Sequence, residues 1–154
     1  MNGNDGHGHP RSTAQIGGHP IHPMLVQFPI VCFILTLVCD VLYTQGHTEL
    51  ATASTWLLIV GLVMGALAAV AGLTDFLGDK RIQGSDAIKH ATANVTAVVL
   101  EVVNLVLRLK NPESIGSTGV WISLVVVLIL LYSGWMGGRL VYIHGIGVND
   151  DRGV

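Results

Sequence analysis

The chain has 154 residues, of which 51% are apolar and only 12% carry a charge, whereas about 25% of the residues in a typical soluble domain are charged. Its mean hydropathy is +0.61. A soluble domain of this length exposes too much surface to water to tolerate so few charges. The formal net charge of −2 does not decide for or against a nucleic-acid partner. The absence of any basic run or patch argues against one. Composition therefore predicts a protein whose main partner is the lipid bilayer.

The first 18 residues are rich in Gly, Asn, His and Ser and contain no apolar stretch. A secretory signal requires such a stretch directly after a basic start, so this segment does not resemble one. We predict a disordered polar tail over residues 1–18, a membrane domain over 19–148 and a short tail over 149–154. His7 and His9 lie in the first tail, either as solvated side chains or as weak metal ligands.

Four stretches are long and apolar enough to cross a membrane, which takes about 20 residues of helix. They run over residues 24–43, 54–74, 91–109 and 120–142. The expected fold class is all-α, an integral membrane bundle of four transmembrane helices joined by short loops. Because such helices alternate in direction, both termini and the 75–90 loop lie on one side of the membrane, side A. The 44–53 and 110–119 loops lie on the opposite side, side B.

Basic residues are distributed unevenly between the two sides. Side A carries Arg11, Lys80, Arg81, Lys89, Arg139 and Arg152, and side B carries Arg108 and Lys110. Cytoplasmic loops of membrane proteins are enriched in lysine and arginine. The six-to-two distribution therefore predicts that side A, with both termini, is cytoplasmic.

Four histidines and one aspartate fall near helix ends on side A. They are His19 and His22 before the first span, Asp75 after the second, His90 at the start of the third and His144 after the fourth. His19 and His22 each precede a proline, which favours an extended or polyproline backbone. With three residues per turn, that backbone places the two imidazoles on one face, roughly 9 Å apart. We name these five residues the histidine layer.

The histidine layer suggests a metal site, because neutral imidazole is the commonest metal ligand and haem iron takes axial histidines. A bundle of four helices can enclose haem b, and three histidines with Asp75 also suit a non-haem zinc, iron or copper ion. The alternative is that the histidines only cap helix ends at the headgroup level. Gln27 and Asn94 are expected about one turn deeper, where their amides bond across the bundle or orient the histidines. His47 stands alone on side B and is assigned no role.

Glu101 lies near the middle of the third span, where a charge is costly and usually faces the bundle interior. It follows His90 by eleven residues, and so shares its helix face about 16 Å deeper. Counting the same distance back from His144 gives Ser133, beside Tyr132, as the expected hydroxyl partners. Burial favours the protonated acid. Glu101 is therefore either a proton relay toward the histidine layer or a neutral acid that fixes packing.

Two further features concern packing. Asp40, near the side B end of the first span, either sits at the membrane interface or pairs with Arg108. Small residues at spacings of three and four let helix backbones approach closely, within one chain or between copies in an oligomer. They are Gly61, Gly65, Ala68 and Gly72 in the second span, and Gly134 and Gly138 in the fourth.

Four motifs are spread over residues 18–148. They are Gly-His-Pro-Ile-His-Pro at 18–23 with Phe-Pro-Ile at 28–30, Gly-Leu-Thr-Asp at 72–75, His90 with Asn94, and Gly-Gly-Arg-Leu-Val-Tyr-Ile-His-Gly at 137–145. Together they resemble the bacterial membrane family called domain of unknown function 2231. The resemblance implies a four-span protein of the bacterial inner membrane with no settled activity. Some relatives look to be joined to Rieske-type iron–sulfur domains, which implies electron transfer with a redox partner protein, although this chain has no cysteine ligands for such a cluster.

Three functional hypotheses remain. The first is a haem- or metal-binding electron-transfer component that uses the histidine layer. The second is a structural or accessory membrane subunit without a cofactor, and the third is a proton-coupled carrier that uses Glu101. The sequence contains no nucleophile motif or phosphate-binding loop, so hydrolase and kinase chemistry are not expected.

Overall fold

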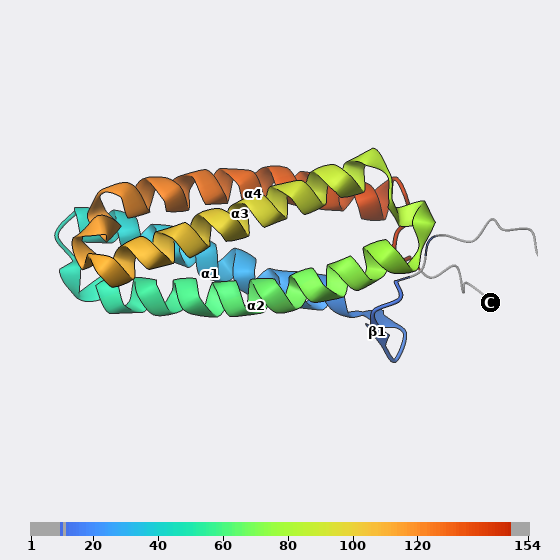
Figure 1. Cartoon of the computed structure of the whole chain (residues 1–154), viewed down its shortest axis with the longest axis horizontal. Coiled ribbons are helices and arrows are strands. Elements are labelled where there is room, and N and C mark those ends of the chain that lie inside the picture. The colour runs from blue at the N-terminus through green and yellow to red at the C-terminus, as the bar shows by residue number, and fades with distance from the viewer. Residues whose placement is uncertain (1–9, 11, 149–154) are drawn as a thin grey trace, which may run out of the picture.

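Four long helices run side by side and alternate in direction along the length of the molecule (Figure 1). The computed structural model describes residue 10 and residues 12–148. The helices are α1 Ile21–Thr44, α2 Ala51–Gly78, α3 Ser85–Lys110 and α4 Thr118–Tyr142. Each is long and apolar enough to cross a membrane. The prediction of an all-α bundle of four transmembrane helices is confirmed, and the chain is an integral membrane protein.

The helices form two hairpins. Within each hairpin the loop contains a short 3-10 helix, η1 Thr48–Leu50 between α1 and α2 and η3 Pro112–Gly116 between α3 and α4. A third one, η2 Lys80–Ile82, joins the hairpins on side A. Helix α1 packs mainly on α2 and α3 mainly on α4, and each hairpin packs more closely within itself than against the other. The bundle is therefore a pair of helical hairpins.

A small β-hairpin precedes the first helix. Strand β1 Gln15–Ile16 pairs antiparallel with β2 His19–Pro20. Gly17 and Gly18 form the turn with φ angles of 57° and 81°, a left-handed backbone that glycine adopts readily. The sequence had placed residues 12–18 in a disordered tail. In the structure residues 12–14 hydrogen-bond to Thr74 and Asp75 of α2, and residues 15–18 form the first strand and the turn of the β-hairpin. The predicted tail residues 1–9 and 149–154, with His7 and His9, lie outside the described residues.

The centre of the bundle is apolar. Phe33, Leu58, Ala97 and Val126 form a buried cluster to which each of the four helices contributes one residue. Gly61 makes this packing feasible, because a Cβ atom there would lie 2.6 Å from Cε1 of Phe33. The outward faces expose valine, leucine and isoleucine to the surroundings. Apolar side chains on the outer faces, with the polar groups turned inward, are what contact with lipid requires.

The small residues of α2 are used inside the chain. Gly61, Gly65 and Ala68 are buried in the bundle. A Cβ atom at Gly134 of α4 would meet no heavy atom within 4 Å. The α2 ridge therefore brings α1 close within one chain, and assembly through the α4 glycines stays a prediction.

Candidate functional site

His22 is seated against the second helix of its own hairpin. It lies in the first turn of α1, and its Nδ1 donates to the Ala68 carbonyl oxygen of α2 at 2.8 Å. Gly72 leaves room for the ring, because a Cβ atom there would lie 2.9 Å from His22 Nδ1. With Nδ1 protonated, the other ring nitrogen, Nε2, keeps a lone pair that can bind a metal.

His90 is seated in the same way in the second hairpin. Its Nδ1 donates to the Ser133 carbonyl oxygen of α4 at 2.9 Å, with the Ser133 hydroxyl oxygen 3.0 Å away. A Cβ atom at Gly137 would lie 3.2 Å from Cε1 of this ring. The Asn94 amide nitrogen donates to His90 Nε2 at 3.1 Å, as expected if Nε2 is the unprotonated nitrogen. The prediction that Asn94 orients a histidine is consistent with this contact.

The two imidazoles meet across the bundle. Their ring centres are 6.2 Å apart and the ring planes are at 89°. In each ring the two nitrogens are separated by one carbon and their bonding directions diverge, so Nε2 does not point to the carbonyl that accepts from Nδ1. Nε2 of His90 points to Asn94. The structure thus brings together two members of the histidine layer, His22 and His90, which we name the histidine pair.

The other members of the layer lie elsewhere. Asp75 accepts hydrogen bonds from the Ser12 hydroxyl and the Ala14 amide, both at 2.8 Å, and so anchors the segment before the β-hairpin. His19 is exposed in β2, and its Nδ1 donates to the Gly17 carbonyl oxygen at 3.0 Å. The predicted polyproline segment with His19 and His22 on one face is wrong, because Ile21 already begins α1.

His144 also has a separate partner. Its Nε2 lies 3.2 Å from the Asp86 carboxylate, which also accepts from Arg139 at 3.0 Å. Across the described residues, no group of three or more His, Cys, Asp or Glu side chains is arranged to hold a metal ion. The expectation of a single five-residue layer therefore narrows to the histidine pair. Gln27 does not reach across the bundle, since its amide donates to the Met24 carbonyl oxygen of its own helix at 3.4 Å.

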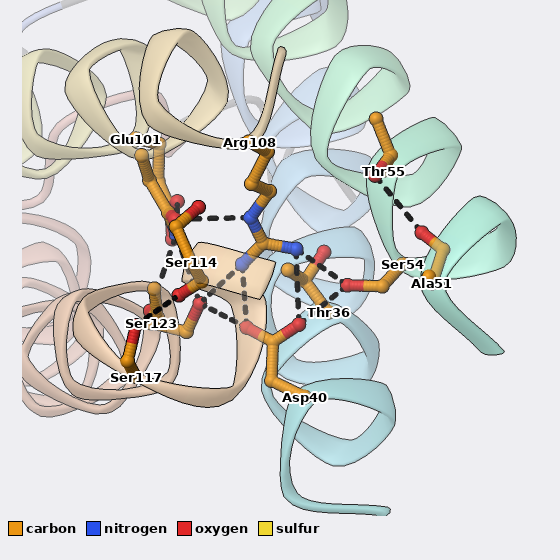
Figure 2. Close-up of polar contacts among 12 residues, drawn as sticks. Thr36, Asp40, Ala51, Ser54, Thr55, Glu101, Arg108, Ser114, Ser117 and Ser123 are labelled. Atoms are coloured by element: carbon orange, nitrogen blue, oxygen red, sulfur yellow. Dashed lines mark hydrogen bonds and ion pairs between the residues drawn. The ribbon is translucent and has the colours of Figure 1, made fainter. Parts of the chain in front are cut away.

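A second polar cluster occupies the bundle interior toward side B (Figure 2). Arg108 of α3 donates to both carboxylate oxygens of Asp40 of α1, at 2.9 and 2.5 Å, and both side chains are almost fully buried. The remaining donors of the guanidinium bond to Ser54 of α2, Ser123 of α4 and Asn104 of α3. Of the two predicted places for Asp40, the pair with Arg108 is the one found. We name these five residues the ion-pair cluster.

Glu101 joins the ion-pair cluster through one oxygen. Its Oε2 accepts from the Asn104 amide at 2.9 Å, and its Oε1 is buried with no hydrogen-bond partner among the described residues. The expected partners are wrong: Ser133 bonds to His90, and Tyr132 is half exposed on the outer face of α4. The reason is helix register, since α3 begins at Ser85 and His90 lies more than one turn inside it.

Sequence reasoning missed three residues of the ion-pair cluster and one partner of His144 at side A. Ser54, Asn104 and Ser123 are ordinary polar residues within apolar runs, and only their common depth on three different helices brings them together. Asp86 was missed because it precedes the apolar run of its helix. A polar residue that recurs on the inward face of every span is a usable signal, because such residues in membranes usually face the bundle interior.

The family model described as "Predicted membrane protein (DUF2231)" matches residues 18–150. The chain belongs to this family. No curated protein and no solved structure matches the chain. The match spans both clusters and all four helices, and its description names no activity. The function must therefore be argued from the histidine pair and the ion-pair cluster themselves.

Proposed function

We propose that the chain binds a redox-active metal centre, a haem b or a single non-haem ion, between His22 and His90, and that it transfers electrons at side A of the membrane. The observation that supports this most directly is the orientation of the two rings. A backbone carbonyl on each neighbouring helix takes the Nδ1 proton. Such a hydrogen bond fixes the tautomer and makes Nε2 the basic atom in metal-ligating histidines.

The separation of the rings also supports the proposal. A metal–imidazole bond is about 2.0–2.1 Å long, so two imidazoles on opposite sides of one ion have their ring centres roughly 6 Å apart. The observed distance is 6.2 Å. The rings are therefore close enough to share an ion. Because they meet edge to face, one ring would have to rotate, and Asn94 would have to release Nε2 of His90. The exposed faces of side A would let a redox partner protein approach the centre, as the family resemblance suggests.

The test measures the metal content and the visible absorption spectrum of the full-length protein, purified in a mild detergent. We expect one metal ion per chain, a reversible one-electron reduction, and loss of the metal in His22→Ala and His90→Ala. His19→Ala and His144→Ala are the matched controls, because these rings lie on the same side but outside the pair; both should retain the metal. A wild-type protein without stoichiometric metal would contradict the proposal.

A second candidate is a proton-coupled carrier, and one observation favours it. Glu101 is fully buried and leaves Oε1 without a hydrogen-bond partner within the described part of the chain. An ionisable group inside a membrane bundle is by default a functional candidate. The polar contacts of Glu101 run toward Asp40, whereas the apolar core residue Ala97 stands between Glu101 and His90 on the same helix. A proton relay through Glu101 would therefore connect to the ion-pair cluster at side B rather than to the histidine pair at side A.

Proton flux into liposomes under an imposed potassium diffusion potential tests this second candidate. Glu101→Gln keeps the shape of the side chain and the acceptor for Asn104 but cannot exchange a proton. We expect the variant to fold normally and to lose the flux if Glu101 carries protons. Equal flux in wild type and variant, or none in either, would leave the cofactor-free subunit as the alternative to the metal proposal.

A further inference from the structure

The first and third helices bury equivalent positions. The buried residues of α1 are Pro29, Phe33, Thr36 and Asp40. Adding 68 to each number gives Ala97, Glu101, Asn104 and Arg108, and all four are buried in α3. His22 and His90 are also 68 positions apart. The inward faces of these two helices therefore have a common register from the histidine pair to the ion pair.

The second and fourth helices show the same relation with a shift of 65. Gly119, Ser123, Val126 and Ser133 are the buried residues of α4, and subtracting 65 gives Ser54, Leu58, Gly61 and Ala68, which are buried in α2. Trp56 and Trp121 obey this shift too, and both are exposed. Few residue types coincide, so the correspondence lies in burial and position rather than in sequence identity.

The packing fits a two-fold axis that runs along the bundle. Helices α1 and α3 both start on side A, so the two hairpins are parallel copies. Beyond its hairpin partner, α1 also packs on α4 and α3 also packs on α2, which is the same contact in the two copies. Parallel repeats in membrane proteins are related by an axis along the membrane normal.

The imidazole seats are equivalent under this relation. His22 bonds to the Ala68 carbonyl with Gly72 beneath its ring. His90 bonds to the Ser133 carbonyl with Gly137 beneath its ring. Ala68 and Ser133, like Gly72 and Gly137, are 65 positions apart. Each hairpin thus holds one histidine by the same Nδ1 contact. The seats differ at Nε2, which in His90 also accepts from Asn94, whereas the position equivalent to Asn94 is Val26.

We infer that the chain is two structural copies of one helical hairpin, and that the site on their shared axis would take haem b, held by His22 and His90, one histidine from each copy. The inference rests on the proposed function and names its ligand. Zinc, iron or copper held by protein alone takes additional ligands, and the described residues offer no group of three or more metal-binding side chains. Haem b would bring its own four nitrogen ligands and its one-electron chemistry, so His22 and His90 would be enough to hold it.

Haem content and spectra of the full-length protein, purified after growth with added haemin, test the ligand. We expect one six-coordinate, low-spin haem per chain. His22→Ala and His90→Ala should each give a five-coordinate, high-spin spectrum, and to the same degree. Gly72→Ala and Gly137→Ala should each weaken haem binding about 10–100-fold, the usual effect of disturbing the groups that orient a metal ligand. Gly134→Ala, on the same helix as Gly137 but facing open space, is the control and should not change binding.

The outcomes separate this inference from the proposed function. Stoichiometric copper or iron without porphyrin would overturn haem as the ligand and leave the metal proposal standing. Haem that depends on one histidine of the pair but not on the other would overturn the equivalence of the seats. No metal of any kind would overturn both the ligand and the proposed function.

The repeat itself has a test that needs no ligand. Asp40 and Arg108 occupy equivalent positions, so exchanging them should preserve the pair. We expect Asp40→Arg and Arg108→Asp alone to lower the thermal unfolding midpoint strongly, since each places like charges together. The double exchange should restore most of that loss. A double variant as unstable as the worse single variant would overturn the repeat.

Discussion

At side B, Arg108 uses all five of its N–H donors on four buried side chains, whereas at side A His22 and His90 each give one proton to a backbone carbonyl and keep an acceptor nitrogen. The ion-pair cluster has little bonding capacity left for a ligand. At the histidine pair, Nε2 of His90 accepts from Asn94, and Nε2 of His22 forms no hydrogen bond within the described residues. A saturated buried network rigidifies and specifies the packing of a bundle, while lone pairs held in place are what a metal centre needs. The two ends thus differ in how completely their hydrogen-bonding groups are used within the chain.

Among these substitutions, Arg108→Met is expected to lower the unfolding free energy the most, because it removes the cation of the ion-pair cluster at side B. The substitution leaves the Asp40 carboxylate buried without its cation, which costs about 3–5 kcal/mol of unfolding free energy for a buried pair. Chemical unfolding in detergent, followed by circular dichroism, measures the loss. Lys110→Met, on the same helix but exposed, is the control. Equal stability of the Arg108 and Lys110 variants would contradict a structural role for the ion pair.

Asp75→Ala should have a smaller and local effect at side A. It removes the acceptor of the bonds from Ser12 and Ala14, and bonds to a charged group contribute about 1.5–3 kcal/mol. We expect faster hydrogen exchange at the Ala14 amide with an unchanged global unfolding midpoint. Asp79→Ala is the control, since Asp79 bonds to Arg81 within its own loop. A lowered global midpoint in the Asp75 variant would mean that the segment before the β-hairpin is part of the bundle's cooperative unit.

The smallest expected effect concerns the exposed Asp79–Arg81 pair. Hydrogen bonds from Arg81 hold the pKa of the Asp79 carboxyl below its usual 3.8. Because this pKa is lowered in the folded protein, the interaction is complete above pH 3.8 and is lost as the pH falls through the lowered value. A carboxyl NMR titration should show the midpoint below 3.8, returning toward 3.8 in Arg81→Gln. An unchanged midpoint in that variant would show that an exposed pair at side A has no measurable coupling.

The fold could be predicted because lipid leaves few choices: long apolar runs form helices and the helices alternate. The Asp40–Arg108 pair was one of two predicted alternatives for the same reason, since two opposite charges near side B have few other partners. Helix register could not be predicted. Hydropathy marks where a helix enters lipid, whereas α3 begins at Ser85, so His90 was placed too near the surface and Glu101 was given the wrong partners.

The role of Gly72 and Gly137 could not be predicted either. The sequence showed Gly72 within a row of small residues, which usually means contact between helix backbones. In the structure the space beside each glycine is filled by an imidazole from a neighbouring helix. A side chain that reaches across from another helix leaves no periodic signal in the sequence of the helix that receives it.

The ion pair has a consequence for how the protein is made. Asp40 belongs to the hairpin that is synthesised first, and Arg108 follows 68 residues later. Until the second hairpin enters the membrane, the Asp40 carboxylate of the first hairpin lies in lipid, which solvates charges poorly. Each hairpin alone therefore carries one buried charge at a cost in insertion free energy. A chain interrupted before α3 therefore retains the Asp40 carboxylate in the bilayer without the cation that pairs with it in the complete protein.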